Sequence, residues 1–143
     1  LRKKYLGNER LKWGVDFPAN SLYKIADILV TDWSGSALSF AFGAEKPILF
    51  IDTPPKVLNP DYREYGITPL EISIREKIGR TLPLDKISYA GEVISYLYKN
   101  KAIYVSRIRE IRADTVFRAG NSATHGANYI NSLAATLERD CPR

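Results

Sequence analysis

The stretch ADILVTDWSGSALSFAFGAEKPILFIDT, residues 26–53, decides the fold of this chain. Its first apolar run ends at Thr31, and a second such run, which follows Lys46 and Pro47, ends at Asp52. Between them a Ser/Gly cluster leads into an almost wholly apolar segment that is long enough for a helix. Strands that alternate with helices predict βαβ units in a parallel sheet. The stretch therefore predicts a Rossmann-like α/β domain with a three-layer α/β/α arrangement.

The corner at residues 32–36 is the candidate ligand site, because parallel sheets bind ligands outside the carboxyl ends of their strands. Ser34 is a suitable N-cap for a helix that begins at Gly35. The acid of a capping box is replaced by Ala37, so no carboxylate neutralises the positive helix end. Gly35 permits a ligand to approach the backbone closely, and the hydroxyls of Ser34 and Ser36 add donors to the free amides. Together these features predict a phosphate-binding site. The alternative is an ordinary capped corner without a ligand.

Three further side chains at the strand ends have open roles. Asp32 is not expected to touch phosphate, because two anions repel each other. It is expected to hold the amides of the turn or, as an alternative, to bind a metal ion. Trp33 packs the turn or stacks on a nucleotide base. Asp52 faces the same crevice or only caps the loop that follows.

Two motifs resemble those of a known family. The sequence T-D-W-S-G-S-A-L-S-F-A of residues 31–41, followed by K-P-I-L-F, resembles the T-D-Y-S-S-x-x-x-D-F/Y-A … K-P-I-I-F signature of the CDP-glycerol glycerophosphotransferase family, the teichoic-acid primases and polymerases. Downstream, F-R-A-G-N-S-A-T-H of residues 117–125, followed by Tyr129 and Ile130, resembles the family's F…D-G-x-A-[ST]-x-R…I segment. The resemblance spans residues 22–133.

The resemblance implies the C-terminal, donor-binding half of a two-domain GT-B enzyme. In the chain, the residues that it implies for the donor-diphosphate site are Thr31, Asp32, Ser34, Gly35, Ser36 and His125, with Asp32 expected to hold the turn and not to touch phosphate. Further contacts to the donor are implied for Trp33, Asp52, Ser122 and Thr124. No metal ion and no cofactor is expected, because the helix dipole and the amides can supply the counter-charge.

Departures from the family pattern leave the donor open. Ser39 and Ala119 stand where the family has carboxylates, so the donor is CDP-glycerol, a related CDP-alditol or a nucleotide sugar. His125 stands where the family has Arg, and it either donates to the diphosphate or is a solvated histidine of the first helical turn. The family's catalytic histidines lie upstream, and no catalytic residue is expected in this chain.

Composition agrees with one domain of a larger enzyme. The 143 residues suit a single domain over the whole chain, 1–143, and the absence of Met predicts that Leu1 is not a native start. The chain is therefore expected to be a fragment. Its one cysteine, Cys141, excludes an internal disulfide and a cysteine-based zinc site. No apolar run is long enough to span a membrane.

The net charge of +5 is spread along the chain. Arg107, Arg109 and Arg112 are interleaved with acidic and apolar residues, as on the wet face of a helix, so no nucleic-acid partner is expected. A basic surface suits a peripheral protein at an anionic membrane, which the resemblance also implies. The expected location is the cytoplasmic, inner face of the cell membrane.

The functional expectation is a donor-nucleotide-binding domain of a glycerophosphotransferase or glycosyltransferase in teichoic-acid, capsule or other cell-surface polymer synthesis. Its partners are a CDP-linked or other nucleotide-activated donor and, through the N-terminal half, a polymeric or lipid-linked acceptor. A nucleotide-sugar epimerase-like domain is the alternative within the same fold. A non-catalytic module that recruits a partner to the membrane surface is the alternative outside enzymes.

The remaining helices and strands are predicted from helix caps, from the periodicity of apolar residues, and from Gly and Pro residues that end an element. Strands are predicted at Trp13–Phe17 and Gly79–Leu82, and a helix N-cap is predicted at Thr68. Helices are predicted over Ser21–Ala26, Leu84–Lys99, Ala102–Arg118 and Ser122–Arg139. The loop Thr53–Tyr65 is long enough to suggest a role in binding.

Overall fold

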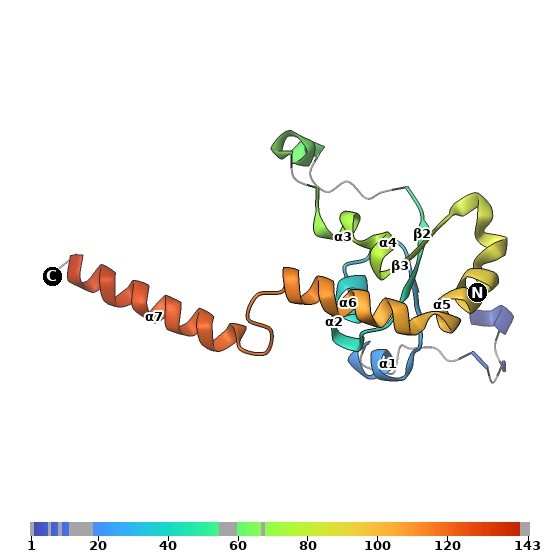
Figure 1. Cartoon of the computed structure of the whole chain (residues 1–143), viewed down its shortest axis with the longest axis horizontal. Coiled ribbons are helices and arrows are strands. Elements are labelled where there is room, and N and C mark those ends of the chain that lie inside the picture. The colour runs from blue at the N-terminus through green and yellow to red at the C-terminus, as the bar shows by residue number, and fades with distance from the viewer. Residues whose placement is uncertain are drawn as a thin grey trace. The chain divides into compact units, whose positions relative to one another are not determined.

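The structure divides into two compact units. The computed structural model describes residues 2–5, 7–8, 10–11, 19–54, 60–66 and 68–140. One unit comprises Leu1–Arg109 and the other Glu110–Arg143. The first unit holds the sheet and most of the helices, and the second is helical (Figure 1). That the whole chain acts as one donor-binding domain stays a prediction.

The sheet of the first unit is parallel and open. Within the described residues it has three strands in the order β1 (Leu29–Thr31), β2 (Ile48–Asp52) and β3 (Gly79–Pro83). Thr31 pairs with Phe50 and Asp52 pairs with Pro83, so the carboxyl ends of the strands lie along one edge. The helix α2 (Ser36–Ala44) joins β1 to β2. The predicted βαβ unit and the mixed α/β fold are therefore confirmed.

The central position of β2 follows from its sequence. Its first three residues, from Ile48 to Phe50, are buried, as expected of a strand that is covered on both faces. The neighbouring strand β3 begins with Gly79, where a Cβ atom would collide with the carbonyl oxygen of Ile48. Glycine is thus required there for the close approach of the two backbones.

Helices on the sheet complete the core of the first unit. Phe40 of α2 is fully buried and meets the ring of Tyr23, from α1 (Ala19–Ile25), edge to face with 5.3 Å between ring centroids. The helix α5 (Ala90–Lys99) contributes Leu97, and α6 (Lys101–Thr115) contributes Ile108. The largest fully buried side chains of the described residues are Phe40, Ile48, Leu49, Ile78, Leu97 and Ile108, together with Pro47.

Several predicted elements agree with the structure, but two boundaries are wrong. The predicted helix over residues 84–99 is a 3-10 helix, η4 (Leu84–Tyr89), followed by α5, because Lys86 has non-helical angles of φ −104° and ψ 15°. Thr68 is not the N-cap of α3 (Leu70–Ser73). Pro69 takes the cap position, because its ψ of 142° is extended rather than helical. The predicted first strand, Trp13–Phe17, lies outside the described residues.

Short helices make up the rest of the first unit. The 3-10 helix η1 (Arg2–Tyr5) lies near the start of the chain, and η3 (Pro60–Tyr65) occupies the end of the predicted long loop. The short helix α4 (Arg75–Ile78) directly precedes β3 and buries Ile78. It also buries Arg75, the only charged side chain among the buried residues that the structure describes.

The second unit contains the end of α6 and the helix α7 (Ser122–Asp140), close to the predicted 122–139. The turn between them uses left-handed angles at Arg118, with φ 57°, and at Gly120, with φ 83°. The amide of Asn121 donates to the carbonyl oxygen of Arg118 at 2.9 Å. Among the described residues, α7 and the other helices are each too short or too polar to cross a bilayer.

Candidate functional site

The corner between β1 and α2 agrees in part with the predicted cap at Ser34, because α2 begins at Ser36, one residue later than predicted, with Gly35 at the N-cap position and no side-chain cap bond there. Gly35 already has helical angles, φ −60° and ψ −17°, and the amide of Ser36 donates to Ser34 Oγ at 3.3 Å. The two serine hydroxyls also bond each other, with 2.8 Å between their oxygens. The first turn of α2 contains no acidic residue. The first turn of α2 therefore adds no negative charge of its own to the positive end of the helix.

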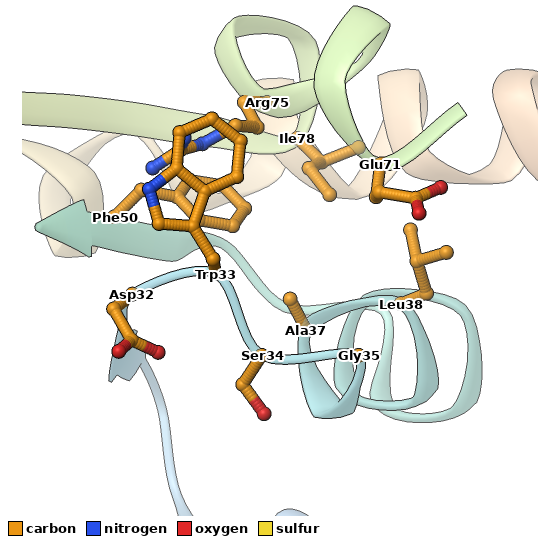
Figure 2. Close-up of a pocket in the computed structure, with 10 residues that line it drawn as sticks. All are labelled: Asp32, Trp33, Ser34, Gly35, Ala37, Leu38, Phe50, Glu71, Arg75 and Ile78. Carbon is orange, nitrogen blue, oxygen red and sulfur yellow. The ribbon is translucent and has the colours of Figure 1, made fainter. Parts of the chain in front are cut away.

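A cavity of about 130 Å³ opens beside this corner. Its walls come from the corner, from α2, from β2, and from α3 and α4 on the far side (Figure 2). The lining residues are Asp32, Trp33, Ser34, Gly35, Ala37, Leu38, Phe50, Glu71, Arg75 and Ile78. The cavity lies at the carboxyl ends of β1 and β2, which is the edge where open parallel sheets bind ligands.

Arg75 is the unexpected member of this cavity. Its side chain is only 7% exposed, and its guanidinium lies between two aromatic rings. The guanidinium carbon is 3.8 Å from the centre of the Trp33 ring and 4.8 Å from that of Phe50. In Figure 2 the indole of Trp33 lies across the guanidinium. Stacking of this kind is favourable for arginine, and it fixes the plane in which the guanidinium donates.

The guanidinium of Arg75 is poorly satisfied. Its Nη1 donates to Asp52 Oδ1 at 3.4 Å, which is long for a hydrogen bond between charged groups. Its Nε and Nη2 are covered and have no partner among the residues that the structure describes. Burial lowers the pKa of Arg75, while the negative charges of Asp52, Glu76 and Asp32 act in the opposite direction. Arginine nevertheless stays charged, so the cavity wall holds a cation with unpaired N–H groups.

Trp33 packs the corner, which is one of its two predicted roles. Its Nε1 donates to the carbonyl oxygen of Thr53 at 2.7 Å, and its ring covers Arg75. These contacts tie the end of β1 to the end of β2 and to α4. A stacking role toward a nucleotide base stays a prediction.

The prediction that Asp32 holds the amides of the turn is wrong. Asp32 is exposed, and no N–H of the described residues donates to it. In Figure 2 its carboxylate and the hydroxyl of Ser34 point away from the Trp33 ring and from Arg75. Asp52, in contrast, faces Arg75, so it belongs to the surroundings of the cavity. No group of three or more His, Cys, Asp or Glu side chains in the described part of the chain is arranged to hold a metal ion.

The predicted site residues of the second motif lie in the second unit. Ser122 begins α7, and Thr124 and His125 follow in its first turn. The amide of His125 donates to the carbonyl oxygen of Asn121 at 3.1 Å, and its Nε2 is 3.5 Å from Arg118 Nη1. His125 thus has a cation as its neighbour. That these residues share a ligand with the corner in the first unit stays a prediction.

Lys46, part of the quoted signature, has a structural role. Its Nζ donates to the carbonyl oxygens of Ala26, Lys24 and Tyr23 at 2.7, 2.8 and 3.2 Å. These are carbonyls at the end of α1, which would otherwise lack partners. Three donors therefore meet three acceptors, and Lys46 fastens α1 to the start of β2.

Comparison with protein-family models, curated proteins and solved structures finds no match to this chain in any of the three. The functional argument therefore rests on the residues and geometry of the corner and its cavity. Sequence reasoning identified the corner but missed Arg75. The available signal was a cation directly after Ile74 and three residues before Ile78, which are both buried.

Proposed function

We propose that this chain binds the diphosphate of a nucleotide-activated donor, as the donor-binding part of a glycerophosphotransferase or glycosyltransferase. The observation that carries the proposal is the cavity beside the acid-free N-terminus of α2, at the carboxyl ends of β1 and β2. The resemblance of residues 31–50 to the CDP-glycerol glycerophosphotransferase family supports it. In that proposal the Rossmann-like domain is the C-terminal half of a GT-B enzyme, with a three-layer α/β/α arrangement.

The physical basis is the fit between a diphosphate and a helix N-terminus. The helix dipole places partial positive charge on the first amides of α2, of which those of Ser36 and Ala37 donate to Ser34, to its Oγ at 3.3 Å and to its carbonyl oxygen at 3.1 Å. Gly35 has no Cβ, and a Cβ added there would meet open space, so the backbone at this point is accessible. A diphosphate at this position gains amide donors and a favourable field without a metal ion. During transfer, the same donors stabilise charge that builds on the leaving nucleotide.

The proposal extends to the pathway and to the cellular site. An acceptor hydroxyl attacks the donor's β-phosphate in a phosphotransferase, or its anomeric carbon in a glycosyltransferase. The acceptor is a cell-surface polymer, such as teichoic acid or capsule, or a lipid-linked precursor. A net charge of +5 favours peripheral contact with the anionic inner face of the membrane.

Calorimetric titration with CDP, UDP and ADP tests this proposal. We expect binding of at least one of them with a Kd on the order of 0.1–1 mM, because the donor's head group and the acceptor half of such an enzyme contribute nothing here. Cytidine, which lacks phosphate, is the matched control and should give no heat. Absence of binding by all three nucleotides, in a sample with the circular dichroism of a folded α/β protein, would contradict the proposal.

A further inference from the structure

We infer that Arg75 is the side chain that binds the donor diphosphate in this cavity. The inference rests on the proposed function and assigns its main cationic contact. Arg75 lines the same cavity as Ser34 and Gly35, although it lies about forty residues further along the chain. It adds a full positive charge to a site that has the partial positive charge of a helix end but whose lining also includes the carboxylates of Asp32 and Glu71.

The unpaired atoms of Arg75 are the observation behind this inference. Nε carries one N–H and Nη2 carries two, and none of these three donors has an acceptor in the described part of the chain. Leaving donors of a buried cation unpaired is unfavourable, and a stable structure normally pairs them. The Nε and Nη2 edge of a guanidinium matches two oxygens of a phosphate, so one bidentate contact satisfies both atoms.

None of the described neighbours of Arg75 forms a hydrogen bond with that edge. Asp52 is half exposed and is held through Nη1 alone, at 3.4 Å. Glu76 and Asp32 act on Arg75 only through their charge, and neither bonds it. Trp33 and Phe50 contact the faces of the guanidinium, not its donors. The protein therefore orients the guanidinium without saturating it, as expected of a group that is arranged for a ligand.

Access to Arg75 requires a local movement. Nε and Nη2 are both covered by protein atoms. The Trp33 indole lies on the guanidinium in Figure 2, and its ring is held by a single hydrogen bond to Thr53. A diphosphate that reaches the Nε and Nη2 edge must displace some of the atoms that cover it, and the indole of Trp33 lies against the same guanidinium. The environment of Trp33 should therefore change when an anion binds.

Titration of Arg75 variants tests the assignment. CDP and inorganic pyrophosphate are titrated into the parent chain, Arg75→Met, Arg75→Lys and the control Arg80→Met, at constant ionic strength. Arg80 is a matched control, because it is an exposed arginine of the adjoining strand. We expect Arg75→Met to weaken both ligands about tenfold or more, since a charge-assisted bidentate contact is lost. Arg75→Lys should recover part of the affinity, and Arg80→Met should bind as the parent does.

The outcomes separate this inference from the proposed function. If the parent and Arg75→Met bind CDP equally well, the assignment of Arg75 fails and the proposed function stands. If no nucleotide binds but pyrophosphate binds through Arg75, the proposed function fails and Arg75 remains an anion-binding residue. If the parent binds neither nucleotides nor pyrophosphate, both fail.

Two further measurements decide the matter even if Arg75→Met does not fold. In a Trp13→Phe background Trp33 is the sole tryptophan, and pyrophosphate should change its fluorescence. Asp52→Asn keeps the shape of the side chain but removes the competing charge, so it should bind pyrophosphate more tightly than the parent. Unchanged fluorescence together with unchanged or weaker binding by Asp52→Asn would overturn the inference.

Discussion

The two edges of the sheet each hold a partly or fully buried cation, and the two cations differ in how they are paired. At the amino edge, Lys46 gives its three N–H groups to three carbonyl oxygens at the end of α1. At the carboxyl edge, Arg75 has one long contact, to Asp52, and leaves Nε and Nη2 without partners among the described residues. Every N–H group of Lys46 therefore has an acceptor, whereas two nitrogens of Arg75 have none among the described residues.

The two ends of α2 differ in charge, because the C-terminal end holds an ion pair and the first turn holds no charged side chain. Its C-terminal end closes at Glu45, whose left-handed φ of 56° lets its amide bond the carbonyl oxygen of Ala41. The carboxylate of Glu45 accepts from Arg109 Nε at 2.6 Å. At its N-terminal end, the Ser36 amide donates to Ser34 Oγ at 3.3 Å and the Ala37 amide donates to the carbonyl oxygen of Ser34 at 3.1 Å, and the first turn has no acidic side chain. The unpaired polar atoms beside this end are therefore Nε and Nη2 of Arg75, within the described part of the chain.

The largest effect is expected at the amino edge. Lys46→Met should lower the free energy of unfolding by about 2 kcal/mol, because three carbonyl oxygens lose a charged donor. Affinity for CDP should not change, since Lys46 lies outside the cavity. Urea unfolding measures the first quantity and calorimetry the second. Lys86→Met is the control, because Lys86 is exposed, and it should change neither. If Lys46→Met is as stable as the parent, the bonds of Lys46 do not stabilise the fold, and the proposed difference between the two edges of the sheet fails.

At the corner, a smaller effect is expected, and it is on nucleotide affinity rather than on stability. Ser36→Ala should weaken nucleotide binding by about 0.5–1.5 kcal/mol and leave the melting temperature nearly unchanged, because its hydroxyl bonds only Ser34 among the residues that the structure describes. Ser34→Ala should lower stability as well, by about 1 kcal/mol or less, because the Ser36 amide loses its acceptor. Calorimetry and thermal unfolding of the two variants give the comparison. If both variants lower stability equally and neither changes nucleotide affinity, the two hydroxyls only cap the helix.

The corner could be predicted from sequence because its signals are local. Ser34 and Gly35 are adjacent, and their meaning depends on the helix that follows directly. The apolar runs of β1 and β2 were likewise sufficient to predict their pairing as parallel strands. The error at Thr68 was also local, since a proline can stand either at the cap or at the first helical position.

The two cations could not be assigned from sequence, because their partners are distant along the chain. Lys46 bonds carbonyls that lie 20 to 23 positions away, and Arg75 meets Asp52 across 23 positions. Only the paired strands bring these groups together. Asp32 was misinterpreted for a related reason. Its expected partners were the amides of its own turn, whereas the structure turns its carboxylate toward solvent.

The most direct test of the anion site compares Gly35→Asp with Gly35→Ala. Neither side chain meets a steric obstacle at its Cβ, so both variants should fold. Gly35→Ala should gain about 0.4–1 kcal/mol of stability, and it should keep measurable CDP binding, weakened at most by the added methyl group, because it adds no charge. The carboxylate of Gly35→Asp suits the helix dipole, so its stability should hold or rise, while it repels phosphate.

Calorimetric titration of both variants with CDP, alongside their thermal unfolding, is the deciding measurement. The account predicts that Gly35→Asp loses measurable binding at an unchanged or higher melting temperature, while Gly35→Ala retains it. Binding of CDP by Gly35→Asp with the affinity of Gly35→Ala would contradict the account, because the diphosphate would then not lie at the N-terminus of α2.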